Sequence, residues 1–282
     1  GIRIMGVFQN NLLAGAAAAA SAGGVGFYDY QIEQSARFDA ASSSYLSRTP
    51  SGAGSSDKIL TISFWAKPTR PEAGGGAGNT FWISQGTSSS SRANIFQYAD
   101  DSNTDAELNS QSSGNDMLLT TKNSFRGNIV GWSHLVLRID TTQSTEADRV
   151  RFYLNGSQMD FYDSSYFSSG DYPGQNETLV WNTTAPIYIG SYFTGALEYD
   201  GYFAEFIMAD GQSYAPTQFG ETKNGVWIPK DPSGTTFGTN GFHIKFANAS
   251  SLGTDSSGNG NDFSVNNMGT DHQVLDSPTF GS

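Results

Sequence analysis

The feature that most constrains this chain is an alternation of apolar and polar residues, which begins near Ser35 and recurs along most of the remaining chain. Successive side chains of a β-strand point to opposite faces of a sheet, so this alternation indicates strands with one buried face. No stretch has the pattern of a helix of normal length, and only a helical turn is expected, near 216–219. The pattern predicts strands at 60–65, 134–139, 149–154, 187–190, 202–208 and 242–246.

Turn signals between these runs favour antiparallel pairing. Asn155-Gly156 directly follows one run, and a type I′ hairpin turn requires positive φ at both of its central residues, which this dipeptide tolerates. Because large β-sandwiches often form one domain, a length of 282 residues does not require two cores. We therefore predict an all-β fold, an antiparallel β-sandwich.

Charge and cysteine content exclude several classes of function. The formal net charge is −12, which repels phosphate backbones and anionic lipid, so nucleic acid and membrane are not expected partners. The chain has no cysteine, which removes disulfides, thiolate metal sites and a cysteine nucleophile. Its stability must therefore come from burial of an apolar core.

The first 34 residues form an Ala/Gly-rich arm that differs from the rest. Gln9 and Asn10 interrupt its apolar run, so we expect the arm to be retained rather than to act as a secretion signal. Gly15 and Gly23 break the alanine-rich part into a piece too short to be a stable helix or to span a bilayer. We predict that residues 1–30 dock on another subunit. The alternative is that they pack on the sandwich of their own chain. The sandwich itself is predicted to span 35–282.

The order of the strand motifs resembles the laminin-G-like group of the concanavalin A-like lectin/glucanase superfamily, over roughly Ser35 to Glu221. The resemblance implies a jelly roll, which the residues after about 222 would extend with further strands. The motifs that carry it are ARFD at 36–39, SYL at 44–46, LTISFW at 60–65, WSHLV at 132–136, FYLNG at 152–156, and IG at 189–190 followed by YDGYFAE at 199–205.

A second, narrower resemblance is to tail or capsid-associated proteins of marine bacteriophages. It implies a virion structural role, as a capsid decoration, tail or fibre component, with other virion proteins or copies of itself as partners through residues 1–30. The segments that carry it are the Ala-rich start, QSARF at 34–38, YLSRTP at 45–50, FGE at 219–221, GVWIPK at 225–230, GTNGF at 238–242 and DSSGNGN at 255–261.

The resemblance to this superfamily also includes retaining glucanases, whose active-site strand has the pattern Glu-x-Asp-x-x-Glu. This chain lacks that pattern. The nearest acids are Glu198, Asp200 and Glu205, but the third has the wrong parity to share one strand face with the others. The sequence does not exclude a Ser-His-Asp triad, because the residues of a triad can be far apart in the sequence and meet only in the folded protein. His134 and His243 are nevertheless expected to be structural. We therefore expect no enzymatic activity.

Calcium is the only cofactor that the resemblance implies, since related domains hold it at the rim of the sandwich. The acids assigned to such a site are Asp39, Asp140 and Asp200, which would supply the hard oxygen ligands that calcium prefers. The alternative is that each aspartate caps a turn.

Aromatic residues in the long loop after Asp160 are the candidate sugar-binding residues, because exposed rings stack on pyranose faces. They are Tyr162, Tyr166, Phe167, Tyr172 and Trp181. The alternative is that they cover the sandwich or bind an adjacent subunit. The expected function is a non-enzymatic virion component that binds host-surface glycans; the alternatives are a secreted, soluble carbohydrate-binding lectin and a glycoside hydrolase.

Overall fold

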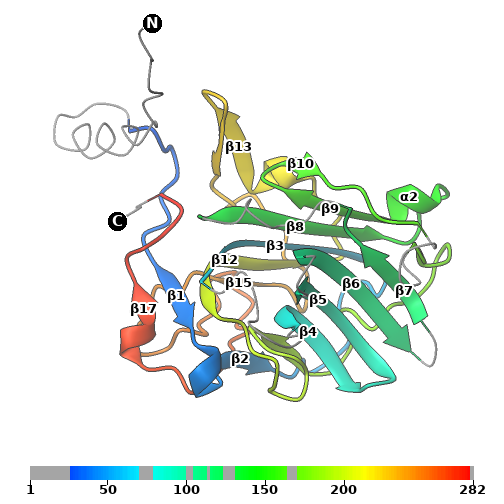
Figure 1. Ribbon diagram of the computed structural model, residues 1–282, viewed down its shortest axis with the longest axis horizontal. Coiled ribbons are helices and arrows are strands. Elements are labelled where there is room, and N and C mark those ends of the chain that lie inside the picture. The colour runs from blue at the N-terminus through cyan, green and yellow to red at the C-terminus, as the bar shows by residue number, and fades with distance from the viewer. Residues whose placement is uncertain are drawn as a thin grey trace, which may run out of the picture.

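The computed structural model describes residues 26–69, 79–99, 104–112, 115–122, 131–163 and 170–279. Two antiparallel sheets pack face to face as a sandwich (Figure 1), which confirms the predicted fold class. Residues 1–25, most of the predicted arm, lie outside the described residues.

The larger sheet, sheet A, has eight strands. β12 lies near its centre and pairs with β3 along one edge; a bulge after Ala204 divides its other edge between β1 and β15. The strands, in spatial order, are β10 (Ser157–Gln158), β9 (Val150–Leu154), β8 (Ser133–Asp140), β3 (Ile59–Pro68), β12 (Gly201–Asp210), β1 (Ser35–Phe38) and β17 (Gln273–Val274), with β15 (Phe242–Ile244) beside β12.

The second sheet, sheet B, has seven strands, all paired antiparallel. They are, in spatial order, β16 (Ser264–Asn266), β2 (Tyr45–Arg48), β11 (Ile187–Ile189), β4 (Thr80–Ser88), β5 (Ser91–Ala99), β6 (Thr104–Ser112) and β7 (Asn115–Thr120). The remaining elements are the hairpin β13 (Gly220–Lys223) and β14 (Val226–Pro229), the helix α2 (Glu146–Arg149) and the 3-10 turns η1 (Ala40–Ser42), η2 (Pro216–Gln218) and η3 (Thr270–His272).

The predicted strands and the turn near 216–219 are confirmed. In β3 the alternate residues Leu60, Ile62 and Phe64 belong to the core between the sheets, while Trp65 belongs to a separate cluster on the outer side. Burial of such side chains contributes about 25 cal/mol per Å² of apolar surface, which makes the inter-sheet core the main source of stability.

The Asn155-Gly156 turn joins β9 and β10 as predicted, with φ of 48° and 79°. Glycine is required there for a second reason. A Cβ atom on Gly156 would lie 2.4 Å from the ring of Trp227, so the turn also allows the β13–β14 hairpin to pack closely.

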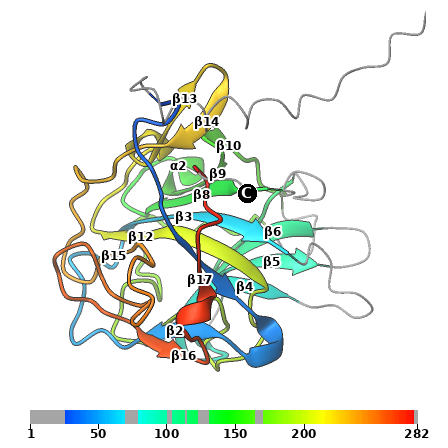
Figure 2. The ribbon, with the colours of Figure 1, turned by 90° about the vertical axis from the view of Figure 1, so that its left-hand side faces the viewer.

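Sheet A has a covered outer face. A strap formed by residues 26–34 crosses it, and Ile32 of the strap packs against Trp65 and Ala204. The C-terminal residues 275–279 run beside the strap (Figures 1 and 2), and Thr279 Oγ1 bonds both the main-chain N–H and the carbonyl of Ile32. Both ends of the described chain therefore lie on the sheet A side of the molecule.

The C-terminal extension contributes to both sheets. It adds β15 and β17 to sheet A and β16 to sheet B, and a second cluster on the outer face of sheet A contains Phe219 and Ile207. Hydrogen bonds hold the polar loop 250–261 in place: Asp255 accepts from three main-chain N–H groups, and Asn259 and Asn261 donate to main-chain carbonyls.

Candidate functional site

The outer face of sheet B carries aromatic side chains that the alternation of β2 and β11 turns away from the core. Leu46, Ile187 and Ile189 point into the core, so Tyr45 and Tyr188 point outward. Both tyrosines are partly exposed, and their ring centroids lie 5.9 Å apart. The pair presents two adjacent, partly exposed aromatic rings on this face of the sheet.

A second aromatic group continues this face toward β5. Tyr192, also partly exposed, lies 4.7 Å from Phe81 between ring centroids, and Phe81 stacks on Phe96 at 4.6 Å. Phe81 and Phe96 are cross-strand partners, and neither belongs to the core between the sheets. Aromatic rings therefore lie on this face from β2 to β5.

Polar side chains form a row beside these rings. The strand register places Ser47, Tyr188, Ser84, Asn94 and Asn109 in succession across five strands. No described residue donates a hydrogen bond to Oδ1 of Asn94 or of Asn109. We call these residues, together with Tyr45, Tyr192, Phe81 and Phe96, the aromatic–amide face.

One carboxyl group of this face has an altered pKa. Glu107 is the cross-strand partner of Phe96 and Thr120. Burial raises the pKa of Glu107 from 4.5 to about 7, and the charge of Arg92 opposes that rise. The charge of the face therefore changes near neutral pH.

The aromatic residues predicted to bind sugar do not share one surface in the structure. Trp181 is only 2% exposed and belongs to the core, so the expectation that it forms a surface platform is wrong. Tyr172 is partly buried and packs edge to face on a neighbouring phenylalanine, and Tyr162 donates to a main-chain carbonyl just beyond β7. Tyr166 and Phe167 lie outside the described residues.

The three aspartates do not form one calcium site. Asp140 ends β8 opposite Ile59, whereas Asp200 precedes Gly201, which pairs with Pro68 at the other end of β3. A strand of this length spans about 30 Å, and calcium holds its ligands within about 2.6 Å, so Asp140 and Asp200 cannot share an ion. Both carboxylate oxygens of Asp140 accept bonds from the following turn.

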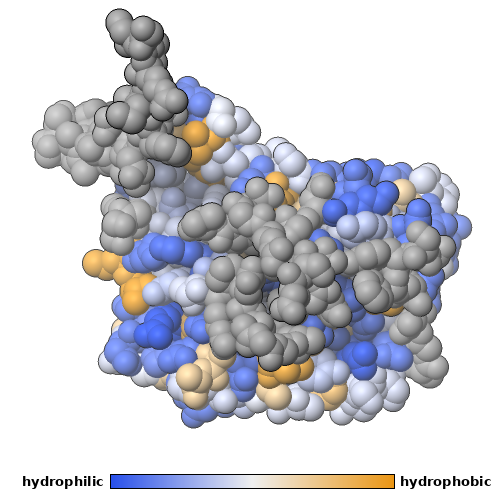
Figure 3. Space-filling model, in the orientation of Figure 1, coloured by the Kyte–Doolittle hydropathy of each residue, from blue (hydrophilic) through white to orange (hydrophobic). Residues whose placement is uncertain are grey.

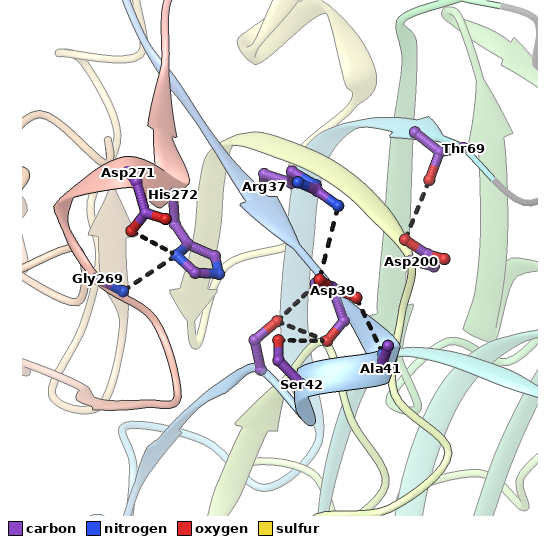
Figure 4. A network of polar contacts seen from close by, with 10 residues as sticks. Arg37, Asp39, Ala41, Ser42, Thr69, Asp200, Gly269, Asp271 and His272 are labelled. Carbon is purple, nitrogen blue, oxygen red and sulfur yellow. Dashed lines mark hydrogen bonds and ion pairs between the residues drawn. The ribbon is translucent and has the colours of Figure 1, made fainter.

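Asp39 and Asp200 do lie near each other at the end of the β1–β12 pair (Figure 4). Asp39 caps η1 by accepting from Ala41 N, and its other oxygen lies 3.6 Å from the Arg37 guanidinium. Asp200 accepts from the Thr69 hydroxyl. Asp39 and Asp140 thus have the capping role that was the alternative. Within the described residues, no three histidine or acidic side chains gather to hold a metal ion.

His134 contacts a serine, but it is not a base for that serine. The Trp227 indole N–H can only donate, and it donates to His134 Nδ1 at 3.0 Å. The proton of the neutral ring is therefore on Nε2, which donates to Ser63 Oγ at 2.8 Å. Burial lowers the pKa of His134 to about 3, so the ring stays neutral at physiological pH.

Glu205 lies at the bulge of β12 with a φ of 47° and is almost buried. One of its oxygens accepts from the Tyr30 hydroxyl at 3.0 Å, and the other contacts His243 Nε2. It lines a small recess together with Tyr30, Trp65, Phe219, Lys230 and Pro232. Both carboxylate oxygens already have partners within the protein.

The surface visible in Figure 3 is mainly hydrophilic in its described part, with small separate hydrophobic groups. Among the helices of the described ranges, none has the length and apolar composition needed to cross a membrane.

Solved structures with similar folds come from several sources. They include domains LG4-5 of the mouse laminin alpha1 chain (11% identity, TM-score 0.43, covering 65% of this chain and 45% of that one) and the CBM40 of a Ruminococcus gnavus IT-sialidase (11%, 0.37, 67% and 96%). Tailspike protein 2 of bacteriophage CBA120, in its enzymatically active domain, is a third (11%, 0.41, 59% and 24%). The chain thus spans less than half of the laminin structure.

A family model gives a clearer assignment. No curated protein matches the chain. Residues 40–211, more than half of the chain, match the model described as the concanavalin A-like lectin/glucanases superfamily, of the laminin G type. This range runs from η1 to the end of β12 and includes most strands of both sheets. The chain therefore belongs to the concanavalin A-like lectin/glucanase superfamily.

Proposed function

We propose that this chain is a non-enzymatic carbohydrate-binding module that binds glycan through the aromatic–amide face. The observation that carries the proposal is the partly exposed Tyr45–Tyr188 pair, with serine and asparagine side chains in register beside it. Aromatic rings stack on the apolar faces of sugars, while amide and hydroxyl groups hydrogen-bond the sugar hydroxyls. The face offers both groups side by side.

The non-enzymatic part of the proposal is supported by two side-chain pairs. His134 donates to Ser63 through Nε2, so it has no free lone pair with which to accept the serine proton. Glu205 has a partner at each oxygen. Neither pair has the arrangement of a nucleophile with its base.

The finer part of the proposal is a role in a virus particle, with the chain attached through its N-terminal arm. Both ends of the described chain lie on the sheet A side (Figures 1 and 2), so an attachment at either end would be made on the side away from the Tyr45–Tyr188 pair of sheet B. Locating the chain in purified native particles by cryo-electron microscopy tests this part. A chain that is absent from particles and secreted as a free protein would favour the soluble lectin instead.

Glycan binding is tested with a glycan array and then by calorimetric titration of the strongest ligand. Tyr188→Ala should weaken binding at least tenfold, about 1.4 kcal/mol, because truncating an aromatic anchor at a binding centre commonly costs that much. Tyr202→Ala is the matched control: Tyr202 is a partly exposed tyrosine of β12 in sheet A. Equal losses in both variants, or no loss in Tyr188→Ala, would refute the assignment of the face.

A further inference from the structure

Two buried oxygen atoms on the aromatic–amide face have no hydrogen-bond donor among the described residues. Asn94 is 2% exposed and Asn109 is 6% exposed, yet Oδ1 of each receives no hydrogen bond from that part of the chain. The two are cross-strand partners, and alternation with the core residues Ile95 and Leu108 places both on the outer side of the sheet. A buried acceptor without a donor costs about 1–3 kcal/mol, so a ligand donor that gains access to these two atoms recovers that free energy.

The charged groups around these amides add further acceptors. Glu107 alternates with core residues of β6 and so lies on the same side as Asn109. Oδ2 of Asp116, on β7, is buried and accepts no hydrogen bond from the described residues. These carboxyl groups favour ligands that donate hydrogen bonds or carry positive charge.

Among the described residues, two cations lie near this face. Arg92 lies two residues before Asn94 on the same side of β5; it donates to the carbonyl of Ser89, and its charge opposes the rise in the pKa of Glu107. Lys122 follows the last residues of β7 and is exposed. An anionic group bound among the asparagines would therefore be desolvated beside carboxylates, and the described residues offer it the single guanidinium of Arg92 in place of the clustered guanidinium groups that usually bind carboxylate or sulfate.

We infer that the ligand of the aromatic–amide face is a glycan rich in hydrogen-bond donors, either neutral or amine-bearing, and not a sialylated or sulfated one. The inference rests on the proposed function and specifies its substrate class. Hydroxyl and N–H groups of the sugar pair with Oδ1 of Asn94 and Asn109, while the rings of Tyr45 and Tyr188 contact its apolar face.

The class is tested with four oligosaccharides of matched length: an N-acetylglucosamine oligomer, its de-N-acetylated counterpart, a sialylated oligomer and a sulfated one. The neutral and the amine-bearing oligomers should bind at least tenfold more tightly than the two anionic ones. Tighter binding of either anionic oligomer would overturn the inference but leave glycan binding intact. Failure of all four, and of a wider glycan array, would refute the proposed function itself.

Asn109→Leu tests the role of the unpaired acceptor separately. Removing a buried acceptor that has no donor should leave the stability of the free protein unchanged or raise it, while the affinity for the neutral oligomer should fall at least tenfold. Asn259→Leu is the control: Asn259 donates to the carbonyls of Gly238 and Gly241, so its loss should lower stability and leave affinity unchanged. Lower stability of Asn109→Leu with unchanged affinity would contradict the inference.

Discussion

The outer faces of the two sheets have the same alternating strands but different surroundings. On sheet A, Trp65 is 4% exposed beneath the strap, stacked on His134, and the β13–β14 hairpin packs beside it through Trp227. On sheet B, Tyr45 and Tyr188 are partly exposed. The face covered by the chain's own ends contributes to stability. On the other face the partly exposed tyrosine pair is the part available to a ligand, whereas Phe81, Phe96, Asn94 and Asn109 are buried.

Replacing an aromatic residue on the covered face should have the largest effect. Trp65→Ala removes a ring that packs on Ile32 and His134, and truncations of this kind cost about 3–5 kcal/mol in the free energy of unfolding. Urea unfolding of the variant and the wild type measures the difference. A loss below about 1 kcal/mol would mean that the strap does not seal this face.

The covered face should make the protein sensitive to acid. His134 has a pKa of about 3 when folded and about 6.5 when unfolded, so the unfolded state binds more protons between these values. Its contribution to stability is complete above pH 6.5 and is lost as the pH falls toward 3, by up to about 5 kcal/mol. Unfolding free energies measured from pH 7 to pH 4 should fall steeply, and His134→Gln should flatten that slope. An unchanged slope in the variant would contradict the assignment.

The open face should have the opposite pH dependence. Glu107 has a raised pKa of about 7 when folded against an ordinary value of 4.5, so the folded state binds more protons between these values. Stability should therefore decrease as the pH rises from 4.5 to 7, by at most about 3 kcal/mol. Comparing Glu107→Gln with the wild type by denaturant unfolding at several pH values isolates this term. If the difference between the two does not depend on pH, Glu107 is not in the environment described.

Removing the hydrogen bonds between the strap and the C-terminal residues 275–279, which we call the clasp, should have a smaller effect on stability. Thr279→Val keeps the shape of the side chain but removes both bonds to Ile32. The carbonyl keeps the bond from Ser277, whereas the buried N–H is left unpaired at a cost of about 1–3 kcal/mol. Thr87→Val, an exposed threonine of β4, is the control and should change stability by no more than about 0.5 kcal/mol. Thermal and urea unfolding measure both variants, and equal effects would show that the clasp adds nothing.

The smallest effect on stability should come from the open face. Tyr188→Ala removes a partly exposed ring whose cross-strand contacts contribute about 0.2–1 kcal/mol. Its unfolding free energy should therefore stay within about 1 kcal/mol of the wild type. A loss as large as that of Trp65→Ala would show that the two faces do not differ as described.

The strands could be predicted because the alternation of apolar and polar residues is visible within each strand's own sequence. The alternation in β3, β8 and β9 and the Asn155-Gly156 turn depend on local geometry, which the sequence displays directly. The same alternation could have placed Tyr45 and Tyr188 opposite the core residues Leu46 and Ile189.

Which outer face stays open could not be predicted in this way. Trp65 and Tyr188 have similar patterns, and only the distant segments 26–34 and 275–279 decide that the first is covered. Trp181 lies in a segment without alternation, so its burial depends on tertiary packing alone. The three aspartates do not form one calcium site for a related reason. Asp140 and Asp200 lie beside opposite ends of β3, and this separation depends on strand register.

The most direct measurement is a crystal structure of the chain with its tightest-binding glycan. We expect a sugar ring in contact with Tyr45 and Tyr188, with hydroxyl or N–H groups donating to Asn94 or Asn109. A glycan bound instead in the recess between Trp65 and Lys230 on sheet A would contradict the assignment of the aromatic–amide face, because the covered face would then be the binding face.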